Sequence, residues 1–444
     1  MVRKIGFALF ACVLVAGQAS AQNWSFDARK IGLGSPGGDE NLATQMIDEA
    51  RNYGAVVLPF GLFQVMRDFD KLNPTNNQFD LIRTMEYAAS PLHYTLGRDT
   101  TDSGSRFVED IRNATLHRDL NYYRGFKPAN QPRAEGLAAP NWGRTIRLAK
   151  RPDGGFHGVY VGAGPYLAMQ SDVSIDPQLI TVLSSPTDMY LPSAQMNLGN
   201  VNRGQMAAAF TGGYRGRFAL PNAVSDRDGI YVALNYNYLH GFRYEDVNLA
   251  MRLDTDRTGL LTVNPFLPSP LLVSRDTASS GSGRAVDTGI GAVVARWDLG
   301  FGINGIANRI NWTNVERTTY SMGNPFLGDS DFLESIAVPV GQASVKLPVN
   351  YRGNVGYNAD LWSAIAEVGK GFGGNSFHGG YEYRLNSLEL RGGAGYARQM
   401  WNPAAGVGFN MSHRLSLDVA VYGNSANVER KRHAAIATSL RFNR

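Results

Sequence analysis

Apolar and polar residues alternate along most of the C-terminal part of the chain. Between residues 345 and 357 the odd positions are mostly apolar, whereas the even positions are mostly polar. A period of two is typical of a β-strand with one apolar and one polar face. Turn residues at 358–360, 373–376 and 386–387 separate this run from those that follow it. The pattern therefore predicts a meander of antiparallel strands up to residue 442.

The same alternation occurs further upstream, where the connections are longer. The segments 254–283 and 322–342 are rich in Pro, Ser, Gly and Asp, and they are predicted to be long loops. Strands are predicted over 206–218, 230–238, 247–253, 293–301 and 315–319.

The first 21 residues have the pattern of a secretory signal. Arg3 and Lys4 precede an apolar run, and Ala19-Ser20-Ala21 forms a cleavage site of the A-x-A kind. The apolar run is too short for the alternative, an N-terminal anchor helix. We expect cleavage near Ala21. Because the single cysteine, Cys12, lies in the signal, the exported chain has no thiol for disulfides or metal ligation.

An exported chain made of amphipathic strands can cross a bilayer only as a closed barrel, in which every backbone group is paired. No later segment is apolar enough to be a membrane helix. We therefore predict an all-β fold, a transmembrane antiparallel up-and-down β-barrel in the outer membrane of a Gram-negative bacterium. About 14 strands (about 12–16) are expected, because single-chain bacterial barrels use even numbers, with the long loops extracellular. The alternative is a β-sandwich, which would need a second sheet over the apolar face.

The two faces of the strands have different expected surroundings, because a membrane barrel turns its apolar face to lipid and its polar face to the lumen. The charged set either lines a pore or cross-braces the interior. The residues expected to face the lumen are Lys346, Arg352, Glu367, Glu382, Arg384, Glu389, Arg391 and Asp418. The residues expected to face lipid are Val345, Leu347, Val349, Leu388, Leu390, Val407, Phe409, Leu415, Leu417, Val419, Val421, Ile436, Leu440 and Phe442.

Residues 22–140 differ from the barrel predicted over 141–444. Helical spacing of apolar residues occurs in 39–53, 78–89 and 107–120, and 56–66 reads as extended. We expect a partly helical plug or hatch in the barrel mouth. A periplasmic cap and a further pair of barrel strands are the alternatives.

The segment Phe26–Gly34, which reads F-D-A-R-K-I-G-L-G, resembles the A-R-x-x-G-x-G opening of FadL-like and TraF/PorV-like outer-membrane barrel proteins. The closing meander, 388–422, is also similar to theirs, whereas Pro36 departs from the pattern. The resemblance implies an N-terminal hatch inside a barrel that passes hydrophobic compounds. Such barrels usually end on an aromatic residue that the assembly machinery recognises, and here Phe442 is followed by two further residues.

Motifs that could carry chemistry have simpler explanations. Gly300–Gly305 fits G-x-G-x-x-G, but strand alternation continues through it, so a dinucleotide site is not expected. The acidic turns at 226–229 and 254–259 lack the ligand series of a calcium loop. The histidines are scattered, and neither H-E-x-x-H nor G-x-S-x-G occurs. We therefore assign no catalytic, metal or cofactor-binding residue and do not expect an enzyme.

Passive, porin-like transport of a small solute across the outer membrane is the expected function, and the resemblance implies a hydrophobic solute. The alternatives are a non-transporting structural or secretion-accessory barrel and a barrel-embedded hydrolase. The expected partners are outer-membrane lipid, lipopolysaccharide and the barrel assembly machinery. A nucleic-acid partner is not expected, because the net charge is only +5 and the basic run 430–432 is short.

Overall fold

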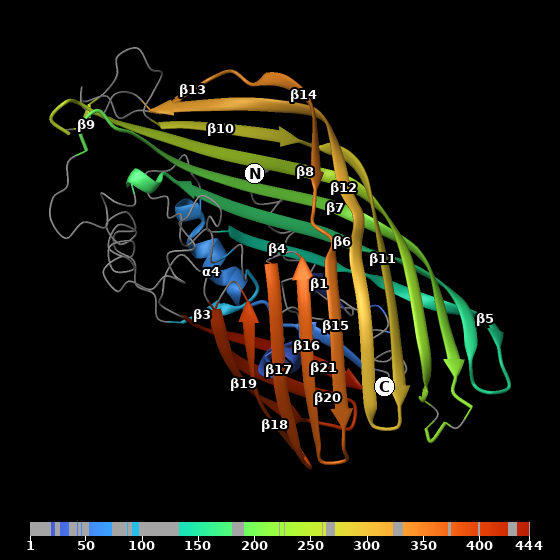
Figure 1. The fold of residues 1–444 in the computed structure, drawn as a ribbon. Coiled ribbons are helices and arrows are strands. Elements are labelled where there is room, and N and C mark those ends of the chain that lie inside the picture. Colours follow the sequence, from blue (N-terminus) through green and yellow to red (C-terminus); the bar gives the residue numbers. More distant parts are fainter. Residues whose placement is uncertain are drawn as a thin grey trace.

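The computed structural model shows a mostly β fold, with the strands of the described residues in one antiparallel sheet of 21 strand segments (Figure 1). Among the described residues no helix is long and apolar enough to cross a membrane. The described residues are 19–22, 27–34, 42, 46, 53–72, 87, 91–96, 133–179, 191–259 without 222 and 226, 261–262, 271–322, 332–371, 374–397, 400–424 and 433–443.

The first part of the sheet contains the longest strands. In several places two or three shorter segments lie end to end along one neighbouring strand, as β4 and β5 do along β6. Counted in this way, each strand position pairs with the next one along the chain. The segments are β4 (Arg133–Pro140), β5 (Trp142–Lys150), β6 (Phe156–Ile175), β7 (Gln195–Ala219), β8 (Gly229–Thr255), β9 (Leu261–Thr262), β10 (Leu271–Ala278), β11 (Ser280–Val294) and β12 (Trp297–Met322).

The second part of the sheet is the meander that the alternation predicts. β13, β14 and β15 follow one another along β12, and each later strand pairs with the one before it. The segments are β13 (Phe332–Glu334), β14 (Val338–Lys346), β15 (Asn350–Asn358), β16 (Trp362–Gly371), β17 (Gly374–Leu385), β18 (Leu388–Ala397), β19 (Met400–Asn410), β20 (Leu415–Asn424) and β21 (His433–Asn443).

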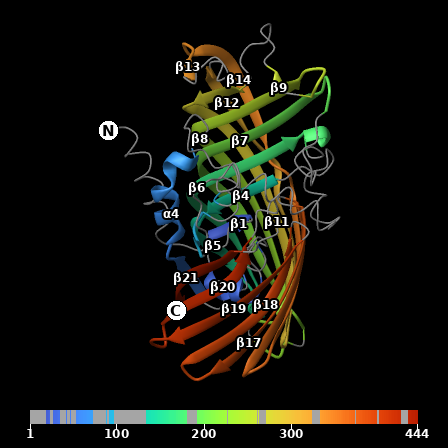
Figure 2. The same ribbon diagram turned by 90° about the vertical axis from the view of Figure 1, so that its left-hand side faces the viewer.

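The N-terminal segment lies along both edges of this sheet. It contains β1 (Ala19–Gln22), α2 (Ala28–Gly32), β2 (Tyr53–Val57), α4 (Gly61–Arg67), η1 (Phe69–Leu72) and β3 (Tyr94–Thr95). β1, which includes the expected cleavage site, pairs with β4, whereas β2 and β3 pair with β21. Figure 2 shows the sheet curled round, with β21 and α4 on one side and β11 on the opposite side.

The predicted helices of this segment are present only where residues are described. Leu42, Met46 and Tyr87 are helical, as expected for 39–53 and 78–89, and 107–120 lies outside the described residues. The extended structure predicted for 56–66 is wrong over residues 61–66, which lie in the helix α4. Besides its helices, the segment adds strands to the sheet, so it forms more than a separate plug.

The single strand predicted over 345–357 is two strands in the structure. β14 ends before Leu347 and β15 begins after Val349, because Pro348 between them has no N–H for the ladder and restricts the residue before it. As a result, odd-numbered residues of β14 and even-numbered residues of β15 lie on the same face of the sheet. Val345 and Leu347 are buried, at 2% and 6% exposed, and Lys346 is exposed, so their predicted lipid and lumen positions are corrected.

The connections differ in length between the two ends of the strands. The predicted long loops are shorter than expected, because 254–283 contains β10 and 322–342 contains β13 and part of β14. The end where β21 also finishes has the connections 151–155, 220–228, 295–296, 359–361, 386–387 and 411–414. The other end has 176–194, 256–270 with β9 inside it, 323–331, 372–373, 398–399 and 425–432. The two longest connections, 176–194 and 256–270, lie at this second end, and we call the first the short-turn end.

Candidate functional site

The strand register shows which residues share a face of the sheet. Cross-strand partners point to the same side, and the pairs Asn304–Asn350, Asn354–Glu367, Glu367–His378, Glu382–Arg391 and Gly408–Asp418 connect β12 to β20 in this way. We call this side the inner face, because α2 packs against it. Its polar residues form two groups, one around α2 and one between β5 and β12.

The first group, which we call the charged cluster, joins four arginines to three carboxylates. Five of its members are residues that the sequence analysis predicted to face the lumen. The charged cluster consists of Arg29 on α2, Glu382 and Arg384 on β17, Glu389 and Arg391 on β18, Asp418 on β20 and Arg441 on β21.

Glu382 is the centre of the charged cluster and is fully buried. It accepts hydrogen bonds from Arg29 Nε at 2.7 Å and Nη2 at 2.9 Å, and from Arg391 Nε at 2.8 Å. Arg391 also donates to Asp418 Oδ1 at 2.7 Å and to Glu389. Arg441 Nε donates to Asp418 Oδ2 at 3.0 Å. Each buried charge of the cluster therefore has an opposite charge within hydrogen-bond distance, as burial requires.

The A-R-x-x-G-x-G segment is the part of the chain that docks on this cluster. Asp27 caps α2 by accepting from the backbone N–H of Arg29 at 2.9 Å. The Ala28 N–H donates to Ser439 Oγ at 3.0 Å, and the His378 ring nitrogen Nδ1 lies 2.7 Å from the Gly34 carbonyl oxygen. Residues at both ends of the motif therefore contact the inner face.

Glycines on β17 and β18 allow the backbone after α2 to approach the sheet. A Cβ at Gly380 would lie 2.1 Å from the Leu33 carbonyl oxygen, and one at Gly393 would lie 2.3 Å from the Leu33 carbonyl carbon. Gly34 has a φ of +77° and would place a Cβ 2.5 Å from the Ala394 backbone nitrogen. The glycines of the motif and of the wall thus fit together.

The other predicted lumen residues lie outside the charged cluster. Arg352 on β15 and Glu367 on β16 are buried and form an ion pair with each other. Lys346 is exposed on β14 and belongs neither to the charged cluster nor to the Arg352–Glu367 pair. Of the residues predicted to face lipid, Leu390, Phe409, Val421 and Phe442 are exposed, and Val349, Leu388, Val407, Leu415, Leu417, Val419, Ile436 and Leu440 are half-buried.

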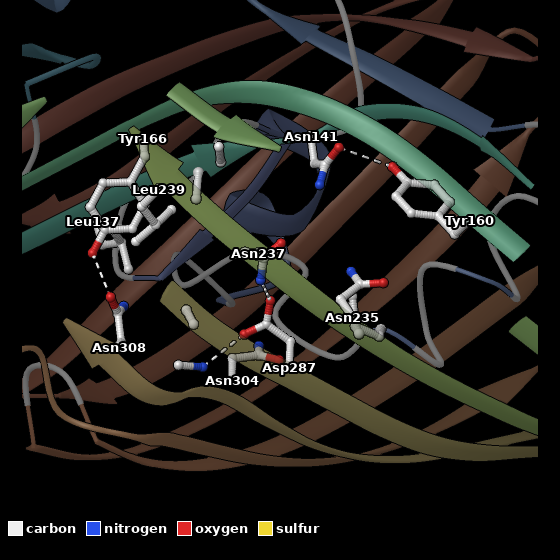
Figure 3. A pocket seen from close by; sticks show the side chains of 15 residues that line it. Leu137, Asn141, Tyr160, Tyr166, Asn235, Asn237, Leu239, Asp287, Asn304 and Asn308 are labelled. Carbon is white, nitrogen blue, oxygen red and sulfur yellow. Dashed lines mark hydrogen bonds between the residues drawn. The ribbon is translucent and has the colours of Figure 1, made fainter. Parts of the chain in front are cut away.

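The second polar group lines a cavity of about 60 Å³ on the inner face of the long strands, which we call the amide cavity (Figure 3). Asn237 Nδ2 donates to Asp287 Oδ2 at 2.6 Å, and the Gly305 N–H donates to Asp287 Oδ1 at 2.7 Å. The Tyr160 hydroxyl donates to Asn141, and the Tyr166 hydroxyl donates to Asn308. The amide side chains of Asn235 and Asn304 also line the cavity.

Apolar residues close the amide cavity at two sides. Toward the long connections lies a buried cluster that includes Leu239, Tyr244 and Trp312. Toward the short turns, Leu42 and Met46 of the N-terminal segment pack on β8 and β11. Because Leu42 also lines the cavity, the N-terminal segment forms part of its wall.

Sequence reasoning missed the amide cavity and two members of the charged cluster. Asn235 and Asn237 alternate with Leu234, Tyr236 and Tyr238, so their placement opposite the apolar face was visible. Arg441 likewise sits on the polar parity of the last strand. Arg29 carried no such signal, because its partner Glu382 lies 353 residues away along the chain.

The described residues contain no group of three or more His, Cys, Asp or Glu side chains that could hold a metal ion. Most polar side chains of both groups are hydrogen-bonded to one another. What the amide cavity offers is a set of amide and hydroxyl groups around the Asp287 carboxylate. What the charged cluster offers is a fixed anchor for α2.

Comparison with known proteins finds similar structures but no similar sequences. No family model and no curated protein matches this chain. The Ralstonia pickettii toluene transporter TbuX matches with a TM-score of 0.32 and 13% identity, covering 72% of this chain and 92% of its own. The Pseudomonas putida toluene transporter TodX has a TM-score of 0.31 and 10% identity, covering 82% and 97%. A triple mutant of Rhodopseudomonas blastica porin has a TM-score of 0.23 and 9% identity, covering 68% and 96%.

Proposed function

We propose that the protein is an outer-membrane β-barrel through which a small solute crosses the membrane passively. The observation that carries the proposal is the reversed burial of the strands. On β8, Leu234, Tyr236 and Tyr238 are 44–50% exposed, whereas Asn235 and Asn237 are 4% and 8% exposed. Water would disfavour this arrangement, but a bilayer outside and a polar lumen inside favour it.

Aromatic residues at the ends of the strands support a position in a membrane. At the short-turn end, the ring centroids of Trp297 and Tyr357 are 4.8 Å apart, and those of Tyr357 and Trp362 are 5.1 Å apart. At the other end of the strands, Tyr396 and Trp401 are 5.2 Å apart. Two aromatic bands that flank an apolar region are typical of outer-membrane barrels.

The connection lengths give the proposed sidedness. Outer-membrane barrels have short periplasmic turns and longer extracellular loops. The end with the short turns and the end of β21 would therefore face the periplasm. In this position the barrel would contact lipid and lipopolysaccharide, and the assembly machinery would recognise the C-terminal strand.

The interior supports transport of a small molecule. The lining of the amide cavity combines hydrogen-bonding side chains with apolar ones, and Leu239 belongs both to this lining and to the adjoining buried cluster. The N-terminal resemblance implies a hydrophobic solute, whereas the hydrogen-bonding groups of the cavity favour a polar one, so both kinds of solute are tested. The proposal assigns no catalytic residue to either surface.

A solute flux assay tests the proposal. The full chain is purified from the outer-membrane fraction, checked for heat-modifiable migration and reconstituted into liposomes. We expect flux of at least one small solute above that of protein-free liposomes. If the folded protein passes no ion, polar solute or hydrocarbon, the transport proposal is wrong.

A non-transporting structural barrel is the second candidate, and the charged cluster favours it. Arg29 and the buried carboxylate of Glu382 hold α2 against the wall. If the N-terminal segment never leaves, the interior stays closed. Absence of flux both in the unchanged protein and in a Glu382→Gln variant with released α2 would support this candidate.

A further inference from the structure

We infer that the amide cavity selects small, uncharged, polar solutes, of which urea is the representative used below. The inference rests on the proposed transport function and adds the chemical class of the solute. It depends on three properties of the cavity, which are the kind of polar groups, their net charge and the available volume.

Amide side chains dominate the polar lining. Each amide has a carbonyl oxygen that accepts and an NH₂ group that donates, so the cavity can bind a solute that does both. The hydroxyl groups of Tyr160 and Tyr166 add further donors and acceptors. The lining amides are Asn141, Asn235, Asn237, Asn304 and Asn308.

The cavity gives no uncompensated charge to an ion. The Asp287 carboxylate already accepts from Asn237 and from the Gly305 N–H, at 2.6 and 2.7 Å. The nearby Arg215 guanidinium donates to Asn235 Oδ1 at 2.7 Å and lies 4.3 Å from the centre of the Tyr160 ring. One buried negative and one buried positive group thus balance each other. An ion would lose its hydration here without gaining a counter-charge.

The volume restricts the solute to a few heavy atoms. A dry cavity that binds benzene has about 150 Å³, whereas the amide cavity has about 60 Å³. An aromatic ring therefore does not fit, and its burial would leave the amides without hydrogen bonds. A planar molecule with one carbonyl and two NH₂ groups has a suitable size and complementary chemistry.

The test measures urea flux into liposomes that contain the full chain, by stopped-flow light scattering. Asn237→Leu replaces the amide by an apolar side chain of nearly the same size. Tyr166→Phe removes only the hydroxyl that donates to Asn308 at 3.1 Å. Each loss of a hydrogen bond to the solute is expected to slow urea flux by roughly fivefold. Asn311→Leu is the matched control, because Asn311 is exposed on the same strand as Asn304, and we expect unchanged flux.

The outcomes separate this inference from the proposed function. Urea flux that falls in both inner variants, but not in Asn311→Leu, supports the inference. Flux of sodium chloride or toluene without urea flux overturns the inference and leaves transport standing, as does urea flux that is equal in all folded variants. Absence of flux for every probe overturns both. If Asn237→Leu shows no heat-modifiable migration, Tyr166→Phe decides the result.

Discussion

Replacement of Glu382 by glutamine should release α2 from the inner face. Arg29 forms an ion pair with the Glu382 carboxylate, whose side chain is 1% exposed. Glutamine has nearly the same shape but lacks the charge, so it removes the ion pair without creating a large cavity. The change also removes the pairs of Glu382 with Arg391 and Arg384, but of these three arginines only Arg29 belongs to α2.

The size of the effect follows from the contacts. Arg29 donates two charge-assisted hydrogen bonds to Glu382, at 2.7 and 2.9 Å, and its own side chain is 23% exposed. Breaking a buried ion pair costs about 3–5 kcal/mol, and the partial exposure of Arg29 places the loss near the lower end. A loss of about 3 kcal/mol raises the ratio of undocked to docked α2 by roughly 100-fold, because about 1.4 kcal/mol corresponds to a factor of ten.

Thiol labelling measures this ratio. The exported chain has no cysteine if the signal is cleaved near Ala21, so Ala28→Cys introduces a single thiol. Ala28 is 1% exposed when α2 is docked, and a maleimide can react only after α2 leaves the wall. When docking is faster than labelling, the labelling rate is proportional to the undocked population. We expect a rate roughly 100-fold higher in Ala28→Cys with Glu382→Gln than in Ala28→Cys alone.

Glu245→Gln is the matched control. Glu245 on β8 also pairs with two arginines, Arg275 at 2.7 Å and Arg243 at 3.2 Å, but it is 33% exposed and does not belong to the charged cluster. Its replacement should leave the labelling of Ala28→Cys unchanged, because exposed pairs contribute little. Equal labelling rates in the Glu245 and Glu382 variants would refute the view that the charged cluster holds α2.

Three further predictions concern the glycine wall, the outer face and one turn. Gly393→Ala should displace α2 and raise the labelling rate of Ala28→Cys, because the added Cβ would meet Leu33. Gly392→Ala should leave the rate unchanged, because its added Cβ would have no atom within 4 Å. Equal labelling rates in the two variants would contradict the close approach of Leu33 to Gly393. For the protein folded in lipid vesicles, Leu234→Arg should lower the free energy of unfolding by about 2–4 kcal/mol. A loss as small as that of an exposed loop substitution would argue against lipid contact. Burial opposes ionisation of Asp228 in the β7–β8 turn, but backbone N–H donors hold its pKa below the ordinary value. Its stabilisation should therefore be present above the unfolded-state pKa and lost as the pH falls through the folded-state pKa. Chemical unfolding in acid and at neutral pH should show this loss for the unchanged protein and not for Asp228→Asn.

The local part of the fold could be predicted from the sequence. Strand alternation depends only on neighbouring residues, so it indicated the inner position of Glu382, Arg391 and Asp418 without any knowledge of their partners. The same reasoning failed at Val345 and Leu347, because one proline separates two strands of opposite parity. Pro348 is visible in the sequence, but the alternation of apolar and polar residues continues across it without a break.

The non-local part could not be predicted in this way. The amide cavity needs the register that brings Asp287 beside Asn237, 50 residues earlier in the chain. The docking of α2 needs a partner for Arg29 among many acidic residues. The A-R-x-x-G-x-G resemblance marked the segment that docks, whereas the contacts explain why its arginine and glycines occupy those positions.

The inner face separates two tasks by charge. In the charged cluster, Arg391 and Glu382 have fully buried side chains, and each contacts more than one opposite charge. Such groups are held in place by the cost of leaving any one of them unpaired, so they brace the wall and fix α2. The amide and hydroxyl groups of the amide cavity, on the other strands, can exchange a hydrogen bond with a solute at a much smaller cost. A solute that crosses should therefore follow the amide side of the interior, while the charged side remains structural.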